Sequence, residues 1–296
     1  GLPVKEIADS AFANHSAFTS ITIPDSVTAI GTNAFDGCDK IETATIPANA
    51  IGAIPKTNLK SVVITSGEIG NFAFDGCVAL TNLTAIESGA FNGCIGIETA
   101  TIPASAISAI PKTNLKTVVI TSGESIAENA FDGCTSLMSI TIPDSITNIG
   151  ANAFNGCSGI ETAIMPASAI ISVPQKNLKT VTITSGEIQE RAFIDCVSLV
   201  NVTFGDGVTT IGTYAFAGCS ALSTVTFGNG IIKIFDGAFN VCEALTGVYI
   251  TDIAAWCSID FSHDPSSSPL NYAKTLYLNG NLVEELIIPG TINQIS

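Results

Sequence analysis

The chain has 296 residues, 46% of them hydrophobic and 12% charged, which is enough apolar material for one large core or a long stack of small ones. Its 26 acidic residues outnumber its 11 basic residues and give a formal net charge of −15. This charge argues against nucleic-acid binding and against anionic membranes, and no apolar stretch nears the roughly 20 residues of a membrane-spanning helix.

A repeated motif runs from the N-terminus onward. Nine copies of the motif have Ala-Phe at the repeat position, and a Cys stands three residues after eight of these nine Phe residues. The first copy has His15 in the Cys position. The motif is usually followed by Leu or Ile, then by a β-rich burst that often ends in Pro, as in residues 137–143. The full unit is about 23 residues long, as the spacing of Leu199, Leu222 and Leu245 shows.

Each unit predicts one short strand and one turn. The pattern Leu-x-x-Ile-x-Ile places apolar side chains on one strand face and small polar ones on the other. A single unit cannot bury that apolar face, so neighbouring units must stack. The Ala-Phe-x-x-Cys arm is shorter than the roughly 12 residues of an independent helix. The sequence therefore predicts an α/β solenoid: a right-handed stack with a parallel β-sheet on one face and short helical or 3₁₀ turns on the other.

Some coils depart from this unit. Three coils of 18 residues, beginning at Ile41, Ile97 and Ile160, have a proline shortcut in place of the Ala-Phe-x-x-Cys arm. A fourth coil, from Leu80 to Cys94, is also abbreviated. The regular pattern therefore does not define the local curvature at these coils.

The C-terminal region interrupts the repeat. A Ser/Pro-rich segment, residues 263–269, precedes Asn279-Gly280, which is a hairpin signal between alternating strand residues. We expect a solenoid over residues 1–250. Over residues 251–296 we expect an irregular coil, a β-hairpin and the start of a further repeat, all continuous with the same solenoid. Because that repeat begins shortly before Ser296, we also expect an excised fragment whose targeting and anchoring signals lie elsewhere.

The repeat Leu-x-x-Ile-x-Ile-Pro-x-x-Val-x-x-Ile-x-x-x-Ala-Phe-x-x-Cys resembles the leucine-rich repeat of the treponemal, or BspA-like, class over nearly the whole chain. Members of that family are mostly surface or secreted proteins of host-associated bacteria and some protozoan parasites, and adhesion to host matrix or to other bacteria is their usual role. The resemblance implies an extracellular or cell-surface binding protein, and the sequence suggests no cofactor.

The cysteines follow the repeat. No Cys-x-x-Cys pair is present, and the gaps between cysteines are repeat periods unlike zinc-ligand spacings. Coils stack roughly 4.8 Å apart with parallel side chains, whereas disulfides need Cβ atoms about 3.8 Å apart. We therefore interpret eight cysteines as a buried structural thiol ladder, with disulfides or metal ligation as the weaker alternative: Cys38, Cys77, Cys94, Cys134, Cys157, Cys196, Cys219 and Cys242. Cys257 lies outside this ladder and receives no role.

Signals for catalysis are few. Only His15 and His263 are available as imidazole bases, and no Gly-x-Ser-x-Gly, phosphate-binding or EF-hand motif occurs. The segment from Asp260 to Asp264 is the one candidate metal or acid–base cluster, and a solvated turn is its simpler interpretation. The sequence predicts that the chain is not an enzyme.

The outward strand positions carry hydroxyls and small apolar groups, with almost no charge or aromatic side chains. We predict that they bind a host matrix or bacterial surface protein. A glycan is less favoured because Tyr249 is the only aromatic platform among them. The alternatives are that Thr is simply a good strand former, that the chain is a structural stalk, or that its Thr rows bind ice. The candidate binding residues are Thr99, Thr101, Thr117, Ser139, Thr141, Thr180, Thr182, Thr203, Thr224, Thr226 and Tyr249.

Overall fold

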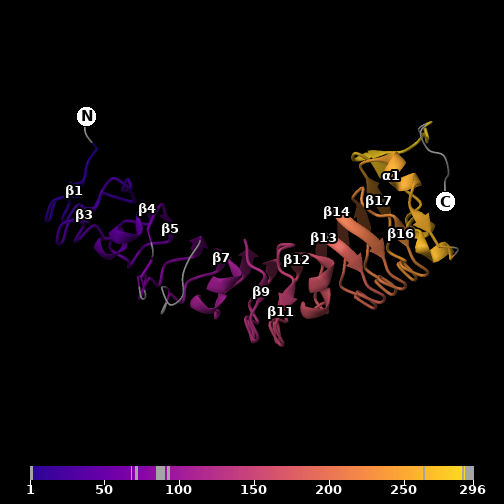
Figure 1. Cartoon of the computed structure of the whole chain (residues 1–296), viewed down its shortest axis with the longest axis horizontal. Helices are drawn as coiled ribbons and strands as arrows, with labels where there is room; N and C mark the ends of the chain where they lie inside the picture. Colours follow the sequence, from indigo (N-terminus) through magenta and orange to yellow (C-terminus); the bar gives the residue numbers. More distant parts are fainter. Residues whose placement is uncertain are drawn as a thin grey trace.

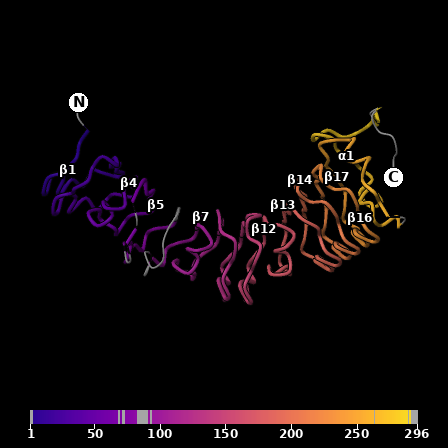
Figure 2. The backbone as a smooth tube through the Cα atoms, in the orientation of Figure 1, coloured from indigo at the N-terminus to yellow at the C-terminus, as the bar shows by residue number. Residues whose placement is uncertain are grey.

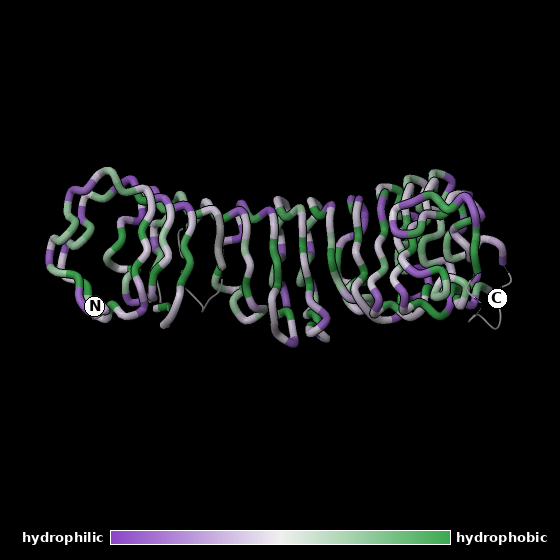
Figure 3. The backbone as a smooth tube through the Cα atoms, turned by 90° about the horizontal axis from the view of Figure 1, so that it is seen from above, coloured by the Kyte–Doolittle hydropathy of each residue, from purple (hydrophilic) through white to green (hydrophobic). Residues whose placement is uncertain are grey.

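A computed structural model of the chain describes residues 3–67, 69–70, 73–84, 91, 94–262, 264–288 and 290, with the side chains of residues 82–84 left aside. The molecule is an elongated crescent of stacked coils that runs from the N-terminal to the C-terminal end (Figures 1 and 2). Seen from above, the coils form side-by-side rungs, and hydrophobic stretches recur along them (Figure 3). The predicted α/β solenoid is confirmed.

One sheet runs through the described coils. It has 16 strands, and neighbours along its main path pair in parallel except for the last pair. In spatial order, the main-path strands are β2 (Ser20–Thr22), β4 (Thr43–Ile46), β5 (Ser61–Ile64), β6 (Asn82–Thr84), β7 (Thr99–Ile102), β8 (Thr117–Ile120), β10 (Ser139–Thr141), β12 (Thr162–Met165), β13 (Thr180–Ile188), β14 (Asn201–Ile211), β15 (Thr224–Phe227), β17 (Gly247–Ile250), β19 (Leu276–Leu278) and β20 (Asn281–Leu282).

Some coils also carry a second, two-residue strand that the sequence analysis did not predict. In Figure 1, β9 and β11 lie along the convex border of the crescent. These strands pair in parallel with their neighbours, and β16 also pairs with the far end of β14. Two residues are too few for a periodic pattern to be recognised. The second strands are β1 (Glu6–Ile7), β3 (Ala29–Ile30), β9 (Ser125–Ile126), β11 (Asn148–Ile149), β16 (Lys233–Ile234) and β18 (Asp260–Phe261).

The sequence predicts a helical or 3₁₀ turn in each Ala-Phe arm, but three 3₁₀ helices lie instead in the proline-shortcut coils. They are η1 (Ala48–Ala53), η2 (Ala104–Ala109) and η3 (Ala167–Ser172), and each follows a Pro with φ between −69° and −67°. The proline ring fixes this φ, so the chain turns sharply after the strand. The Ala-Phe arms are tight turns instead, as where Cys38 N donates to Phe35 O at 3.1 Å.

Phenylalanine rings from successive arms stack along the core. The ring centroids are 5.3 Å apart in Phe12–Phe35, 4.8 Å in Phe74–Phe91, 5.2 Å in Phe131–Phe154, 5.1 Å in Phe193–Phe216 and 5.5 Å in Phe216–Phe239. The stacks stop at the shortcut coils, which have no such Phe. Offset stacking of this kind adds to the burial energy of each ring.

All eight ladder cysteines are free and buried in the arms, beside this ring column. Five thiols donate to the Phe carbonyl of the preceding arm, namely Cys38, Cys94, Cys157, Cys219 and Cys242, at 2.9–3.2 Å. Cys196 follows a shortcut coil with no such Phe and donates to Gln175 Oε1 at 3.4 Å instead. The thiols therefore supply hydrogen bonds between coils as well as apolar volume.

This burial predicts a loss of stability in alkali. Burial and the nearby Asp195 carboxylate raise the pKa of Cys196 from 9.0 to about 11, and burial raises the pKa of Cys242 to about 12. Below pH 9 both folded and unfolded thiols are protonated, so their stabilising contribution is complete. As the pH rises from 9 towards 11, the unfolded thiols ionise before the folded ones, and the free energy of unfolding falls by up to about 1.4 kcal/mol per pH unit for each thiol.

Urea unfolding at pH 7.5, 9 and 10.5 measures this slope. The comparison is with Cys242→Ala, which differs from the unmodified chain in this side chain alone and whose slope should be shallower. Equal slopes in the two proteins would contradict the assignment to this thiol.

The C-terminal insertion continues the stack with different elements. Helix α1 (Ile253–Cys257) is capped by Asp252, and its Trp256 packs edge-on against Phe227 at 5.1 Å. Cys257 is buried at the end of α1 and belongs to the core. In η4 (Pro265–Ser267), the carbonyl of Ser266 accepts from Phe239 N at 3.1 Å, which is the role of Ala carbonyls in other arms. Helix α2 (Leu270–Ala273) follows, and β19 and β20 form an antiparallel hairpin across Asn279 and Gly280.

Candidate binding surface

On both sides of β6, the outward side chains of the main sheet form two rows, which we call the strand face. They lie side by side because consecutive strands pair in an unbroken register. The first row contains Thr43, Ser61, Thr99, Thr117, Ser139, Thr162, Thr180, Asn201, Thr224 and Gly247. The second row contains Thr45, Val63, Thr101, Val119, Thr141, Ile164, Thr182, Thr203, Thr226, Tyr249 and Tyr277.

All eleven candidate residues lie on this one face, and all eleven are half-buried. Five belong to the first row: Thr99, Thr117, Ser139, Thr180 and Thr224. Six belong to the second row: Thr101, Thr141, Thr182, Thr203, Thr226 and Tyr249. The second row also exposes apolar side chains, including Val63 at 48% and Ile164 at 37%. The surface is therefore mixed, with hydroxyls interrupted by aliphatic groups.

Paired charges line the rim where the strands begin. Three Glu–Lys pairs bridge adjacent coils there: Glu42–Lys60 at 2.8 Å, Glu98–Lys116 at 2.6 Å and Glu161–Lys179 at 2.8 Å. Their side chains are about half exposed, so each pair contributes little to stability. Because the two rows contain no charged residue, the rim sets the electrostatics of the surface.

The structure adds one residue that the sequence analysis missed. Tyr277 of β19 pairs in register with Tyr249 of β17, and their rings stack with centroids 4.6 Å apart and planes 9° from parallel. The alternation in Thr275-Leu276-Tyr277-Leu278 matches that in Gly247-Val248-Tyr249-Ile250 and was the available signal. This equivalence is difficult to recognise in the sequence, because the insertion between the two strands makes this coil longer than the repeat.

The segment from Asp260 to Asp264 is occupied by structural contacts. Asp260 forms an ion pair with Lys233 at 2.6 Å. Asp264 caps η4, where hydrogen bonds from the Ser266 hydroxyl and backbone N–H lower the pKa of its carboxyl. His263 lies outside the described residues. Among the residues that the structure describes, no group of three or more His, Cys, Asp or Glu side chains is placed to hold a metal ion.

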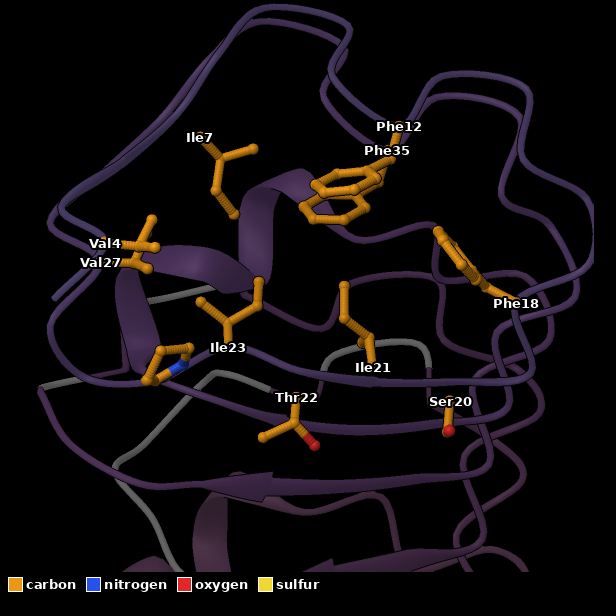
Figure 4. Close-up of a pocket in the computed structure, with 11 residues that line it drawn as sticks. Val4, Ile7, Phe12, Phe18, Ser20, Ile21, Thr22, Ile23, Val27 and Phe35 are labelled. Atoms are coloured by element: carbon orange, nitrogen blue, oxygen red, sulfur yellow. The ribbon is translucent and has the colours of Figure 1, made fainter. Parts of the chain in front are cut away.

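The N-terminal end of the stack opens into an apolar cavity of about 350 Å³. Figure 4 shows Ile21 of β2, and Ile23 just after this strand, directed into it, with Phe12 stacked on Phe35 at its wall. Its other lining residues include Val4, Ile7, Phe18 and Val27. These are the residue types of the coil interior, so the cavity is the open end of the core column. Within the described part of the chain, no helix has the length and apolar character to cross a membrane.

Comparison with known proteins gives consistent matches. The family profile described as "BspA type Leucine rich repeat region (6 copies)" matches residues 3–57, 52–113, 108–178 and 172–257. No curated protein matches the chain by sequence.

Solved structures resemble the chain as well. A leucine-rich repeat protein from Bacteroides ovatus is 23% identical, with 87% of this chain and 78% of that chain covered and a TM-score of 0.36. A leucine rich cell surface protein from Faecalibacterium prausnitzii is 26% identical, with 92% and 86% covered and a TM-score of 0.29. TLR13, in a complex with ssRNA13, is 14% identical, with 96% and 43% covered and a TM-score of 0.60, a likeness of fold alone.

Proposed function

The chain belongs to the BspA-type leucine-rich-repeat family, and from this we propose that it is an extracellular or cell-surface binding module that recognises a host or bacterial protein through the strand face. Repeat proteins of this kind present extended curved surfaces to their partners. The observation that carries the proposal is the unbroken pair of rows, in which strands distant in sequence present an uncharged surface of hydroxyls and exposed aliphatic groups.

A protein partner fits this surface better than a nucleic acid. The net charge of −15 repels phosphate, so the RNA named with TLR13 is a poor guide to this chain. Exposed Val63 and Ile164 offer apolar contacts, while the Thr hydroxyls both donate and accept hydrogen bonds. Binding of this kind is distributed over many weak contacts and needs no catalytic centre.

The size of the surface places a further requirement on the partner. From β7 to β15 the rows extend about 30 Å at a strand spacing of about 4.8 Å, and two alternating positions span about 10 Å of each strand. The product of this length and width is less than half of the roughly 800 Å² that a standard interface buries on each partner. A stable partner must therefore also reach the rim, where Lys116 and Lys179 are about half exposed.

The proposal predicts that Thr141→Lys weakens partner binding by about tenfold or more. A lysine in the middle of the second row adds a charge and a long side chain to an uncharged interface. The measurement is binding of the purified chain to an array of host matrix proteins, mucins and bacterial surface proteins, followed by titration of the tightest binder.

The matched control is Thr147→Lys, in the same coil. Thr147 is exposed beside β11, on the convex border, so this variant adds the same charge away from the strand face. Equal binding by both variants and the unmodified chain would remove the strand face as the site. A folded, monodisperse chain that binds no protein on the array would favour the rival role of a structural stalk that presents another domain.

A further inference from the structure

The stacked tyrosines create an aromatic wall at one end of the strand face. Tyr249 and Tyr277 lie on adjacent strands, and their 4.6 Å ring separation is close to the spacing of the strands themselves. The rings therefore stand upright on the sheet, each facing along the solenoid. One face of Tyr249 is covered by Tyr277, and its opposite face is directed towards β15.

Gly247 makes room for both rings. A Cβ atom built on Gly247 would lie 2.9 Å from Cε2 of Tyr249 and 3.4 Å from Cε2 of Tyr277. Gly247 is accordingly buried, although it occupies an outward strand position. The two rings lean along their strands across this glycine. The free face of Tyr249 therefore looks over Thr224 and Thr226, which pair with Gly247 and Tyr249 in the adjacent strand.

The floor beside this wall is polar and uncharged. Thr224 Oγ1 donates to Asn201 Oδ1 at 2.6 Å, and within the described part of the chain the two amide N–H donors of Asn201 have no partner. Among the described residues, the hydroxyls of Thr203 and Thr226 have no side-chain hydrogen bond, and neither tyrosine hydroxyl has a protein partner. A ligand seated here meets an aromatic face at its side and donors and acceptors beneath it.

We propose that Tyr249 and Tyr277, with the floor of Asn201, Thr203, Thr224 and Thr226, form a binding site for a neutral carbohydrate. The C–H groups of one pyranose face are weakly positive and pack against the negative face of an aromatic ring. The hydroxyls at the edge of the sugar match the Thr and Asn groups of the floor. The net charge of −15 disfavours anionic sugars. This site overlaps the C-terminal end of the strand face, but the proposal does not require the protein-binding function.

A set of defined probes tests the proposal. The unmodified chain is screened on immobilised lactose, lacto-N-tetraose and mannopentaose, with 3′-sialyllactose as the anionic arm and decaproline as the peptide arm. We expect binding of at least one neutral saccharide. Of the four tyrosines in the chain, Tyr249 and Tyr277 should show the largest ring shifts in an NMR titration with that saccharide.

Variants locate the site. Tyr249→Ala and Tyr277→Ala should each weaken saccharide binding by about tenfold or more, whereas Tyr249→Phe should keep it within about threefold because the stacking face remains. Thr141→Lys lies five strands from Tyr249 and three from the nearest floor residues on β14, and it should leave saccharide binding unchanged while it weakens binding of the protein partner. The two proposals can therefore fail independently.

Several results would overturn the site. One is a folded chain that binds none of the neutral saccharides, and another is saccharide binding that persists in both alanine variants. The others are tighter binding of 3′-sialyllactose than of lactose, and binding of decaproline by a chain that binds no saccharide. If one alanine variant does not fold, the other variant and the tyrosine ring shifts of the unmodified chain still decide the question.

Discussion

Phe216→Ala is expected to lower the free energy of unfolding by about 3–5 kcal/mol. Phe216 is fully buried and stands in the middle of a three-ring stack, 5.1 Å from Phe193 and 5.5 Å from Phe239. Phe204 meets it edge-on at 5.6 Å. Removing the ring leaves a cavity bordered by these three aromatic rings, and the surrounding coils cannot collapse into it without breaking their register.

Urea unfolding followed by two probes measures the loss. Trp256 is the one tryptophan of the chain and packs against Phe227 near the affected coils, so its fluorescence reports the C-terminal stack. Circular dichroism reports the whole solenoid. Because each coil contacts only its neighbours, the tryptophan transition should move to lower urea more than the circular dichroism transition does.

The control is Phe12→Ala, at the N-terminal end of the same ring column. Phe12 is 39% exposed and has a core ring, Phe35, stacked on one face only. We expect its loss to be less than half that of Phe216. Similar losses at both positions would mean that the ring stack does not carry the stability assigned to it.

Gly230→Ala is expected to destabilise the chain by about 2–3 kcal/mol through overpacking between coils. A Cβ atom at this position would lie within 2 Å of the carbonyl oxygen of Asp206 and 2.9 Å from that of Val208, as the preceding coil passes directly beneath it. Both obstacles are backbone atoms, so a side-chain rotation cannot relieve the clash. The two coils must separate, and the pairing of β14 with β15 and β16 should weaken.

A matched glycine separates this clash from the general effect of replacing glycine. Gly52 in η1 has no heavy atom within 4 Å of an added Cβ, and its φ is not positive. Gly52→Ala should therefore be neutral or stabilise the chain by up to about 1 kcal/mol, because alanine restricts the unfolded chain. Thermal and urea unfolding of both variants give the comparison. A Gly230→Ala protein as stable as Gly52→Ala would rule out the close contact between these coils.

The repeat pattern by itself determined the solenoid and the direction of most side chains. Alternation over three or four residues, as in Val248-Tyr249-Ile250, is enough to separate inward from outward positions, because side chains on a strand alternate between its faces. The regular spacing of Phe216, Phe239 and their equivalents likewise placed the arms in one column, since units of equal length stack in register. These features depend on local sequence and on the repeat length alone.

The tertiary structure decided the features that cross the irregular coils. Tyr277 reaches Tyr249 only because α1, η4 and α2 together complete one coil, in which Ser266 supplies the carbonyl that an Ala supplies elsewhere. Thr184 Oγ1 donates to Asp144 Oδ1 at 2.5 Å across a shortcut coil, a contact between residues 40 apart in sequence. An insertion or a deletion breaks the repeat length, so the sequence no longer states which residues become neighbours. Backbone hydrogen bonds between stacked coils align the strands on either side of such an irregular coil, and these bonds form only when the coils pack together.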